Sequence, residues 1–209
     1  PVEISTTINH SKKLNLKDIF KIRNVWIGLI LMLGFQGIVS GLRFLIPFLL
    51  EHQIQVSTKV SSLILLSYPL GFIFLSTWAG KHSDSGSPIR LMKYACVLGL
   101  ATLITYSFVV SHQTVWQISL LLILLGVSTG LFTAPNNLII TKGRSPSEIR
   151  DLSSLIPITL NTSFMLGTFF FSLPPVLREP KMALLIGAAV FGGSLLLLGL
   201  QKDPQIRKS

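Results

Sequence analysis

The sequence predicts an all-α polytopic membrane protein with six transmembrane helices, and three observations carry this prediction. First, 49% of the 209 residues are hydrophobic and only 12% are charged, whereas a soluble domain carries about 25% charged residues. Second, the charges gather in short clusters between long apolar stretches, and are not spread along amphipathic faces. Third, the apolar stretches approach the roughly 20 residues that a helix needs to cross a bilayer core of about 30 Å.

Six apolar stretches are long enough to be spans. Only a helix satisfies its own backbone hydrogen bonds inside the bilayer, so each stretch is expected to be helical. The expected spans are residues 24–50, 60–79, 91–110, 115–140, 152–177 and 182–200. Turn-forming residues fill the loops at 82–88 and 142–147. Because the linkers are short, neighbouring helices are expected to be antiparallel.

The basic residues indicate the orientation of the chain. Fourteen of the 18 Lys and Arg residues precede the first span, follow the second and fourth spans, or lie in the tail. Short basic loops stay on the cytoplasmic side, so both termini are expected to be cytoplasmic in a multi-pass protein of the plasma membrane. This divides the chain into a basic segment (1–23), a six-helix domain (24–200) and a tail (201–209). Residues 12–23 are either an amphipathic helix on anionic headgroups or a solvated linker.

Several classes of protein are disfavoured by the same residues. The net charge of +10 does not indicate nucleic-acid binding, because Lys and Arg flank apolar runs and form no solvated basic face. The four histidines are dispersed and Cys96 is a single cysteine, so we expect no metal site. No apolar stretch carries a hydrolase-type catalytic arrangement, and an enzyme is therefore not expected.

Arg43 is the one formal charge deep inside an expected span. An ionisable residue at such a position is costly and therefore suggests a function. Two interpretations stay open, because Arg43 lies about seven residues before the end of the span. It either contacts a substrate or a carboxylate, or extends toward the outer headgroups.

Other candidates for a cavity wall are polar or aromatic residues within spans: Gln36, Asn161 and Phe164. Each has an alternative role in helix packing.

Gly126 and Gly130 lie four residues apart and are followed by Pro135. This pattern of small residues predicts a close approach between two helices.

None of the eight acidic residues falls inside an expected span. A carboxylate for proton coupling would therefore have to lie outside this chain.

The segment from Gly80 to Leu91 resembles the loop that joins the second and third helices of each half in major facilitator superfamily transporters. Gly80, Asp84 and Arg90 match the pattern of that loop, whereas Ser85 and Ser87 depart from it. The resemblance implies that these three matching residues form a gating loop. An ordinary helix cap by Asp84 is the alternative. Two looser stretches, 46–50 with 68–71 and 126–136, resemble the drug:proton antiporters with fourteen helices.

The resemblance implies one half of a two-half bundle, and a chain that begins at Pro1 is expected to be a fragment. The implied function is proton-driven efflux of drugs or other small molecules by alternating access, without a cofactor. The implied partners are the lipid bilayer, a small-molecule substrate, and either the missing N-terminal half or a second copy. Two alternatives stay open: a non-transporting six-helix subunit or sensor, and an uptake carrier for sugars or metabolites.

Overall fold

The computed structural model of the protein describes residues 22–52, 54–109 and 114–201. Within these ranges every element is a helix and no strand occurs. The helices are α2 (Arg23–His52), α3 (Thr58–Leu65), α4 (Ser67–Ser85), α5 (Pro88–Val109), α6 (Val115–Thr141), α7 (Pro146–Phe171), α8 (Pro174–Arg178) and α9 (Pro180–Leu200). The basic segment expected at residues 12–23 lies almost wholly outside the described residues, as does the tail beyond Gln201.

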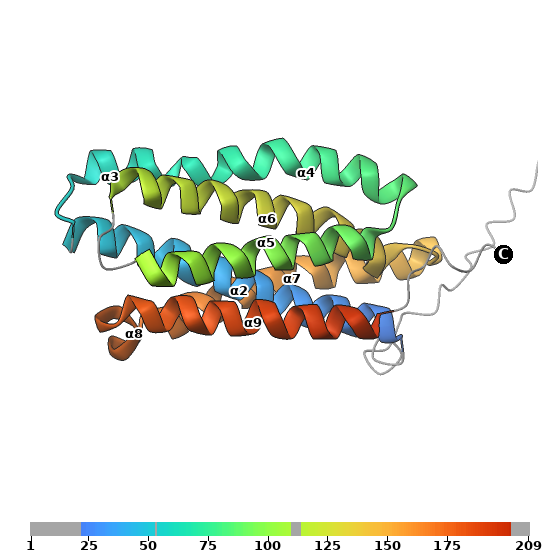
Figure 1. Cartoon of the computed structure of the whole chain (residues 1–209). Helices are drawn as coiled ribbons and strands as arrows, with labels where there is room; N and C mark the ends of the chain where they lie inside the picture. Colours follow the sequence, from blue (N-terminus) through green and yellow to red (C-terminus); the bar gives the residue numbers. More distant parts are fainter. Residues whose placement is uncertain (1–21, 53, 110–113, 202–209) are drawn as a thin grey trace, which may run out of the picture.

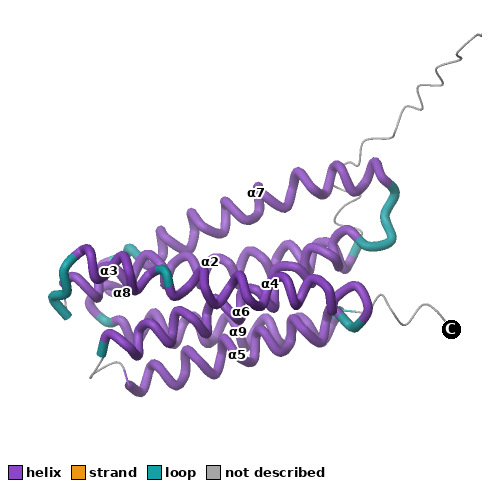
Figure 2. Tube along the Cα trace, turned by 90° about the horizontal axis from the view of Figure 1, so that it is seen from above, coloured by secondary structure: helices purple, strands orange, loops and turns teal. Residues whose placement is uncertain are grey.

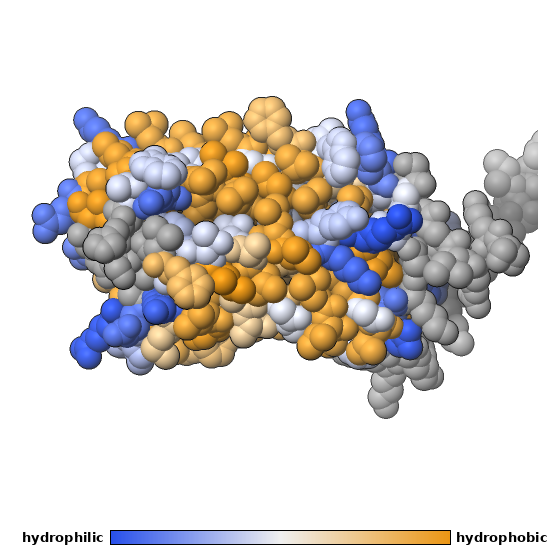
Figure 3. All heavy atoms as spheres, viewed as in Figure 1, coloured by the Kyte–Doolittle hydropathy of each residue, from blue (hydrophilic) through white to orange (hydrophobic). Residues whose placement is uncertain are grey.

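Six helical segments in the described ranges are long and apolar enough to cross a membrane, with α3 and α4 together forming the second. The predicted all-α class and the six spans are thus confirmed. Figure 3 shows an apolar band across the middle of the molecule, with hydrophilic residues at both ends. This distribution is the one that a bilayer imposes on a spanning bundle.

The helices α2 and α6 form the centre of the bundle (Figure 1). The helix α6 packs against α4, α5 and α2, while α2 also contacts α7 and α9, and α5 contacts α9. In the most apolar window of each span, 67% of the residues are buried in α2 and 56% in α6, against 17% in the α3–α4 span and 17% in α7. Figure 2 shows α7 along one edge of the bundle. The second and fifth spans therefore have the largest unpartnered faces.

Small residues allow two helix pairs to approach closely. A Cβ atom added at Gly126 would overlap the backbone of α4 at Tyr68 and lie 2.8 Å from the amide nitrogen of Phe72. A Cβ atom added at Gly130 would lie 2.8 Å from the amide nitrogen of Ser76. Between α2 and α7, a Cβ atom at Gly167 would overlap the carbonyl oxygen of Gly37. At both contacts the backbones meet where a side chain would not fit.

Buried polar side chains join the central helices. The Gln36 side chain of α2 is only 4% exposed and donates to the hydroxyl of Thr133 on α6 at 3.0 Å. The Asn136 amide donates to the Gly28 carbonyl at 3.2 Å, again between α6 and α2. Such interhelical hydrogen bonds stabilise a membrane bundle by about 1 kcal/mol or less each.

The fifth span was predicted about six residues too far toward the C-terminus. The helix α7 begins at Pro146, after Ser145, whose side chain accepts from the Glu148 amide while the Glu148 carboxylate accepts from the Ser145 amide. This reciprocal capping box fixes the start of the helix. The Pro174–Pro175 pair then opens the separate helix α8. Because proline lacks the amide hydrogen that would continue a helix, the span ends before this pair.

The loop expected at residues 82–88 is mostly helical. The helix α4 continues to Ser85, and only Gly86 and Ser87 separate it from α5. The Ser83 hydroxyl donates to the Ala79 carbonyl at 2.6 Å. A serine that bonds to the preceding turn in this way is tolerated inside a helix.

Candidate functional site

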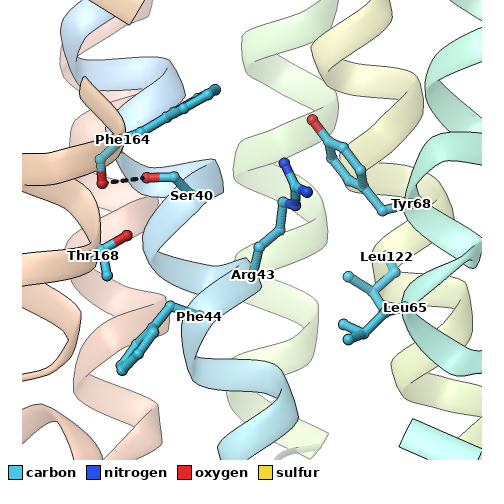
Figure 4. Close-up of a pocket in the computed structure, with 8 residues that line it drawn as sticks. All are labelled: Ser40, Arg43, Phe44, Leu65, Tyr68, Leu122, Phe164 and Thr168. Atoms are coloured by element: carbon cyan, nitrogen blue, oxygen red, sulfur yellow. Dashed lines mark hydrogen bonds between the residues drawn. The ribbon is translucent and has the colours of Figure 1, made fainter. Parts of the chain in front are cut away.

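A pocket of about 320 Å³ opens between the central helices and the two exposed ones (Figure 4). Its size is at the lower end of the range for sites of small organic ligands. Four of the six spans contribute side chains. The lining residues are Ser40, Arg43 and Phe44 of α2, Leu65 of α3, Tyr68 of α4, Leu122 of α6, and Phe164 and Thr168 of α7.

Arg43 crosses the pocket toward Tyr68. Its guanidinium carbon lies 4.7 Å from the centroid of the Tyr68 ring, which is the geometry of a cation–π contact. In Figure 4 the guanidinium lies on the side of Ser40, one turn earlier in α2, and not on the side of Phe44. Side chains on a helix lean toward its N-terminus, so this arginine extends deeper into the span and away from the His52 end.

The wall made by α2 and α7 is tightly packed. The Ser40 hydroxyl lies 3.1 Å from the Gly37 carbonyl and 3.4 Å from the Phe164 carbonyl, to both of which it is placed to donate (Figure 4). A Cβ atom at Gly167 would meet the Ser40 hydroxyl as well as Gly37. Close packing of the backbones thus places the Phe164 and Thr168 side chains beside Arg43.

Of the four residues that the sequence predicts to line a cavity, the structure places two in the pocket and two outside it. Arg43 and Phe164 line the pocket together. Gln36 is buried between α2 and α6, where it bonds to Thr133, and is not among the lining residues. Asn161 is exposed on α7 outside the pocket.

Six lining residues were not predicted: Ser40, Phe44, Leu65, Tyr68, Leu122 and Thr168. Helical spacing is the signal that would have found some of them. Ser40 and Phe44 lie three residues before and one residue after Arg43, and Thr168 lies four residues after Phe164. Positions three and four apart share a helix face, so the wall of α2 extends from Arg43 toward Ser40 and that of α7 from Phe164 to Thr168.

The expected gating residues lie at one end of the bundle, far along α4 from Tyr68. Gly80 is in α4, Asp84 is in the last turn of that helix, and Arg90 is exposed in the first turn of α5. Ser87, and not Asp84, directly precedes α5, so Asp84 does not occupy the N-cap position of that helix. The Asp84 side chain is outside what the structure describes, and the gating role stays a prediction.

The exposed face of α7 differs in chemistry from that of α9. Exposed polar residues on α7 include Asn161 and Thr162, about midway along a spanning helix. On α9 every exposed residue described after Lys181 is apolar, and Leu196 is 78% exposed. Lipid tails satisfy no polar group, so the face of α9 suits lipid. The face of α7 also exposes Met165 and Phe169, and the Thr162 hydroxyl donates to the Ile158 carbonyl, so Asn161 is the residue that suits water or another helix there.

Comparisons with known proteins add a distant relative. Over 154 residues, which are 74% of this chain, the sequence is 25% identical to the riboflavin transporter RibZ of Clostridioides difficile (strain 630). The chain is similar to a membrane transporter. This similarity supports a multi-pass membrane protein and does not favour an enzyme. The matched region covers 34% of the length of RibZ, so the chain spans about a third of that relative. No family model matches the chain, and no solved structure matches it.

Proposed function

We propose that this chain is the C-terminal six-helix half of a major-facilitator-type secondary transporter that moves a small organic molecule across the membrane. The observation that carries the proposal is the pocket between α2, α4, α6 and α7, which contains a cation within a membrane span. An ionisable residue facing a cavity inside a membrane is characteristic of a substrate or ion pathway. A pathway also explains polar residues on the exposed face of α7.

The other half of the transporter is the partner that fits the unpartnered faces of α4 and α7. Facilitators bind substrate near the bilayer midplane, between two six-helix halves. The similarity to about a third of RibZ supports a chain that supplies one part of a longer transporter. A second copy of this chain is the alternative partner. The gating role of Gly80, Asp84 and Arg90 belongs to the same proposal, as does the placement of both termini in the cytoplasm.

For direction and energy source, we propose proton-driven efflux. None of the eight residues lining the pocket is acidic, so the titrating carboxylate would come from the other half. An uptake carrier for a metabolite is the second candidate. It is favoured by the relative, whose name gives riboflavin, a metabolite, as its substrate.

Flux measurements on the full-length gene product in proteoliposomes test this proposal, with riboflavin, the cationic dye ethidium and the aromatic anion 2-naphthoate as probes. Antiport predicts that at least one probe moves against its own gradient, opposite to the proton flow, and that a protonophore abolishes this movement. Movement only down the probe's own gradient, insensitive to pH, would favour the carrier. Flux of all three probes equal to that of protein-free liposomes would contradict transport and favour a non-transporting subunit.

A further inference from the structure

We propose that the pocket around Arg43 binds a planar aromatic molecule with an anionic group, a substrate class that rests on the proposed transport function. The charge of Arg43 lies deep within its span. The helix α2 has 30 residues, and Arg43 lies five to six residues beyond its middle, or about 8 Å at 1.5 Å per residue. With the middle of α2 placed at the bilayer midplane and a half-thickness of about 15 Å for the bilayer core, the Arg43 Cα atom lies about 7 Å inside the hydrocarbon region.

The Arg43 side chain points toward the middle of the span. Extension to the outer headgroups would place the guanidinium on the His52 side of its own Cα atom. Figure 4 shows it on the opposite side, next to the Tyr68 ring. The guanidinium of the exposed Arg43 therefore points into the pocket and away from the nearer end of the span.

Arg43 has no counter-charge among the residues that line the pocket. Arginine stays charged at any physiological pH, and a cleft with low-dielectric walls and charge of one sign concentrates counter-ions even where water enters it. No acidic side chain of the described ranges lines the pocket. The Tyr68 ring contacts the guanidinium at 4.7 Å as a π-partner but carries no negative charge. An anion that enters the pocket would supply the partner, and the N–H groups of the guanidinium match a carboxylate in a two-point arrangement.

Phe44, Tyr68 and Phe164 contribute three aromatic rings to the lining. Figure 4 shows the two phenylalanines on one side of Arg43 and Tyr68 on the other. Aromatic faces and edges pack favourably against a flat ring system. A cationic aromatic molecule stacked on Phe164, the substrate type that a phenylalanine alone suggests, would be repelled by Arg43 in the same small pocket. The combination selects an aromatic anion over an aromatic cation.

Three probes that share one ring system separate these possibilities: 2-naphthoate, 2-naphthamide and 2-naphthylmethylammonium. Binding to the full-length gene product in nanodiscs is measured by equilibrium dialysis, so no transport is needed. We expect 2-naphthoate to bind about 10- to 100-fold more tightly than the cation, since hydrogen bonds to charged groups have this strength. Arg43→Gln is expected to abolish the preference, and Arg43→Lys to retain part of it, because lysine keeps the charge but loses the planar fork.

Arg178→Gln is the matched control, because Arg178 is an exposed residue of α8 outside the pocket. It should leave the binding of all three probes unchanged. Equal binding of the three probes by the wild type, or an unchanged preference in folded Arg43→Gln, would overturn the proposal and indicate that a carboxylate of the other half neutralises Arg43. If Arg43→Gln does not fold, the proposal is still tested by the preference of the wild type for 2-naphthoate over the cation, and by whether Arg43→Lys weakens that preference. Selective binding without flux would contradict the transport proposal alone, whereas flux without selective binding would contradict this inference alone.

Discussion

Gly126→Ala is expected to lower the free energy of unfolding of the membrane domain by about 2 kcal/mol. The added methyl group would overlap the Tyr68 carbonyl and approach the Phe72 amide nitrogen, both of them backbone atoms of α4. Backbone atoms cannot move aside as a side-chain tip does, so α4 and α6 must separate. The gain in helix propensity from glycine to alanine, up to about 1 kcal/mol, offsets only part of this cost. Thermal unfolding of the full-length gene product in detergent measures the effect.

Gly193→Ala is the control for this substitution. Gly193 also lies within a spanning helix, α9, but a Cβ atom there meets nothing within 4 Å. Its melting temperature should be equal to or slightly above that of the wild type. Equal melting temperatures for the Gly126 and Gly193 variants would show that the close approach of α4 and α6 does not determine stability.

Gly167→Ala is expected to weaken the binding of 2-naphthoate about tenfold in a protein that still folds. The new methyl group would overlap the Gly37 carbonyl and the Ser40 hydroxyl, and would push α7 away from α2. Phe164 and Thr168 would then leave their positions beside Arg43. Binding in nanodiscs checks this, together with elution as a monodisperse species in size-exclusion chromatography.

The control for Gly167→Ala is Gly199→Ala on α9, where an added Cβ atom has no neighbour within 4 Å. This variant should bind 2-naphthoate as the wild type does. Unchanged affinity in folded Gly167→Ala would mean that α7 is not a wall of the site. Such a result would leave Arg43 and Tyr68 as the recognition elements that remain to be tested.

The spans were predictable because the bilayer imposes one dominant requirement, a long apolar helix. The ends of the spans were less predictable, since they depend on local chemistry. The capping box of Ser145 and Glu148 starts α7 among residues that hydropathy assigns to a loop. Likewise, Ser83 satisfies its hydroxyl on the Ala79 carbonyl, so polar residues continue α4 where a loop was expected.

The site was predictable only in part, because hydropathy does not tell which face of a membrane helix meets another helix. Arg43 was predicted from the energetic cost of a charge inside a membrane span. That cost can be read from the sequence without knowing which helices are neighbours. Gln36 and Phe164 were equally plausible from the sequence, yet the structure buries one against α6 and places the other in the pocket. Tyr68 belongs to the pocket because α4 lies close against α6 at Gly126, a contact that is set by the tertiary fold.

The proposed transport function requires the α2–α7 wall to face a water-accessible substrate pathway inside the membrane. Cysteine labelling of the full-length gene product in membranes tests it most directly, after the single native cysteine, the buried Cys96, is replaced by alanine. Thr168→Cys lines the pocket, and Leu196→Cys lies on the apolar face of α9. We expect a membrane-impermeant, charged thiol reagent to label Thr168→Cys and not Leu196→Cys, and 2-naphthoate to slow the labelling. Absence of labelling at Thr168→Cys, or equal labelling of both positions, would contradict a substrate pathway along α7.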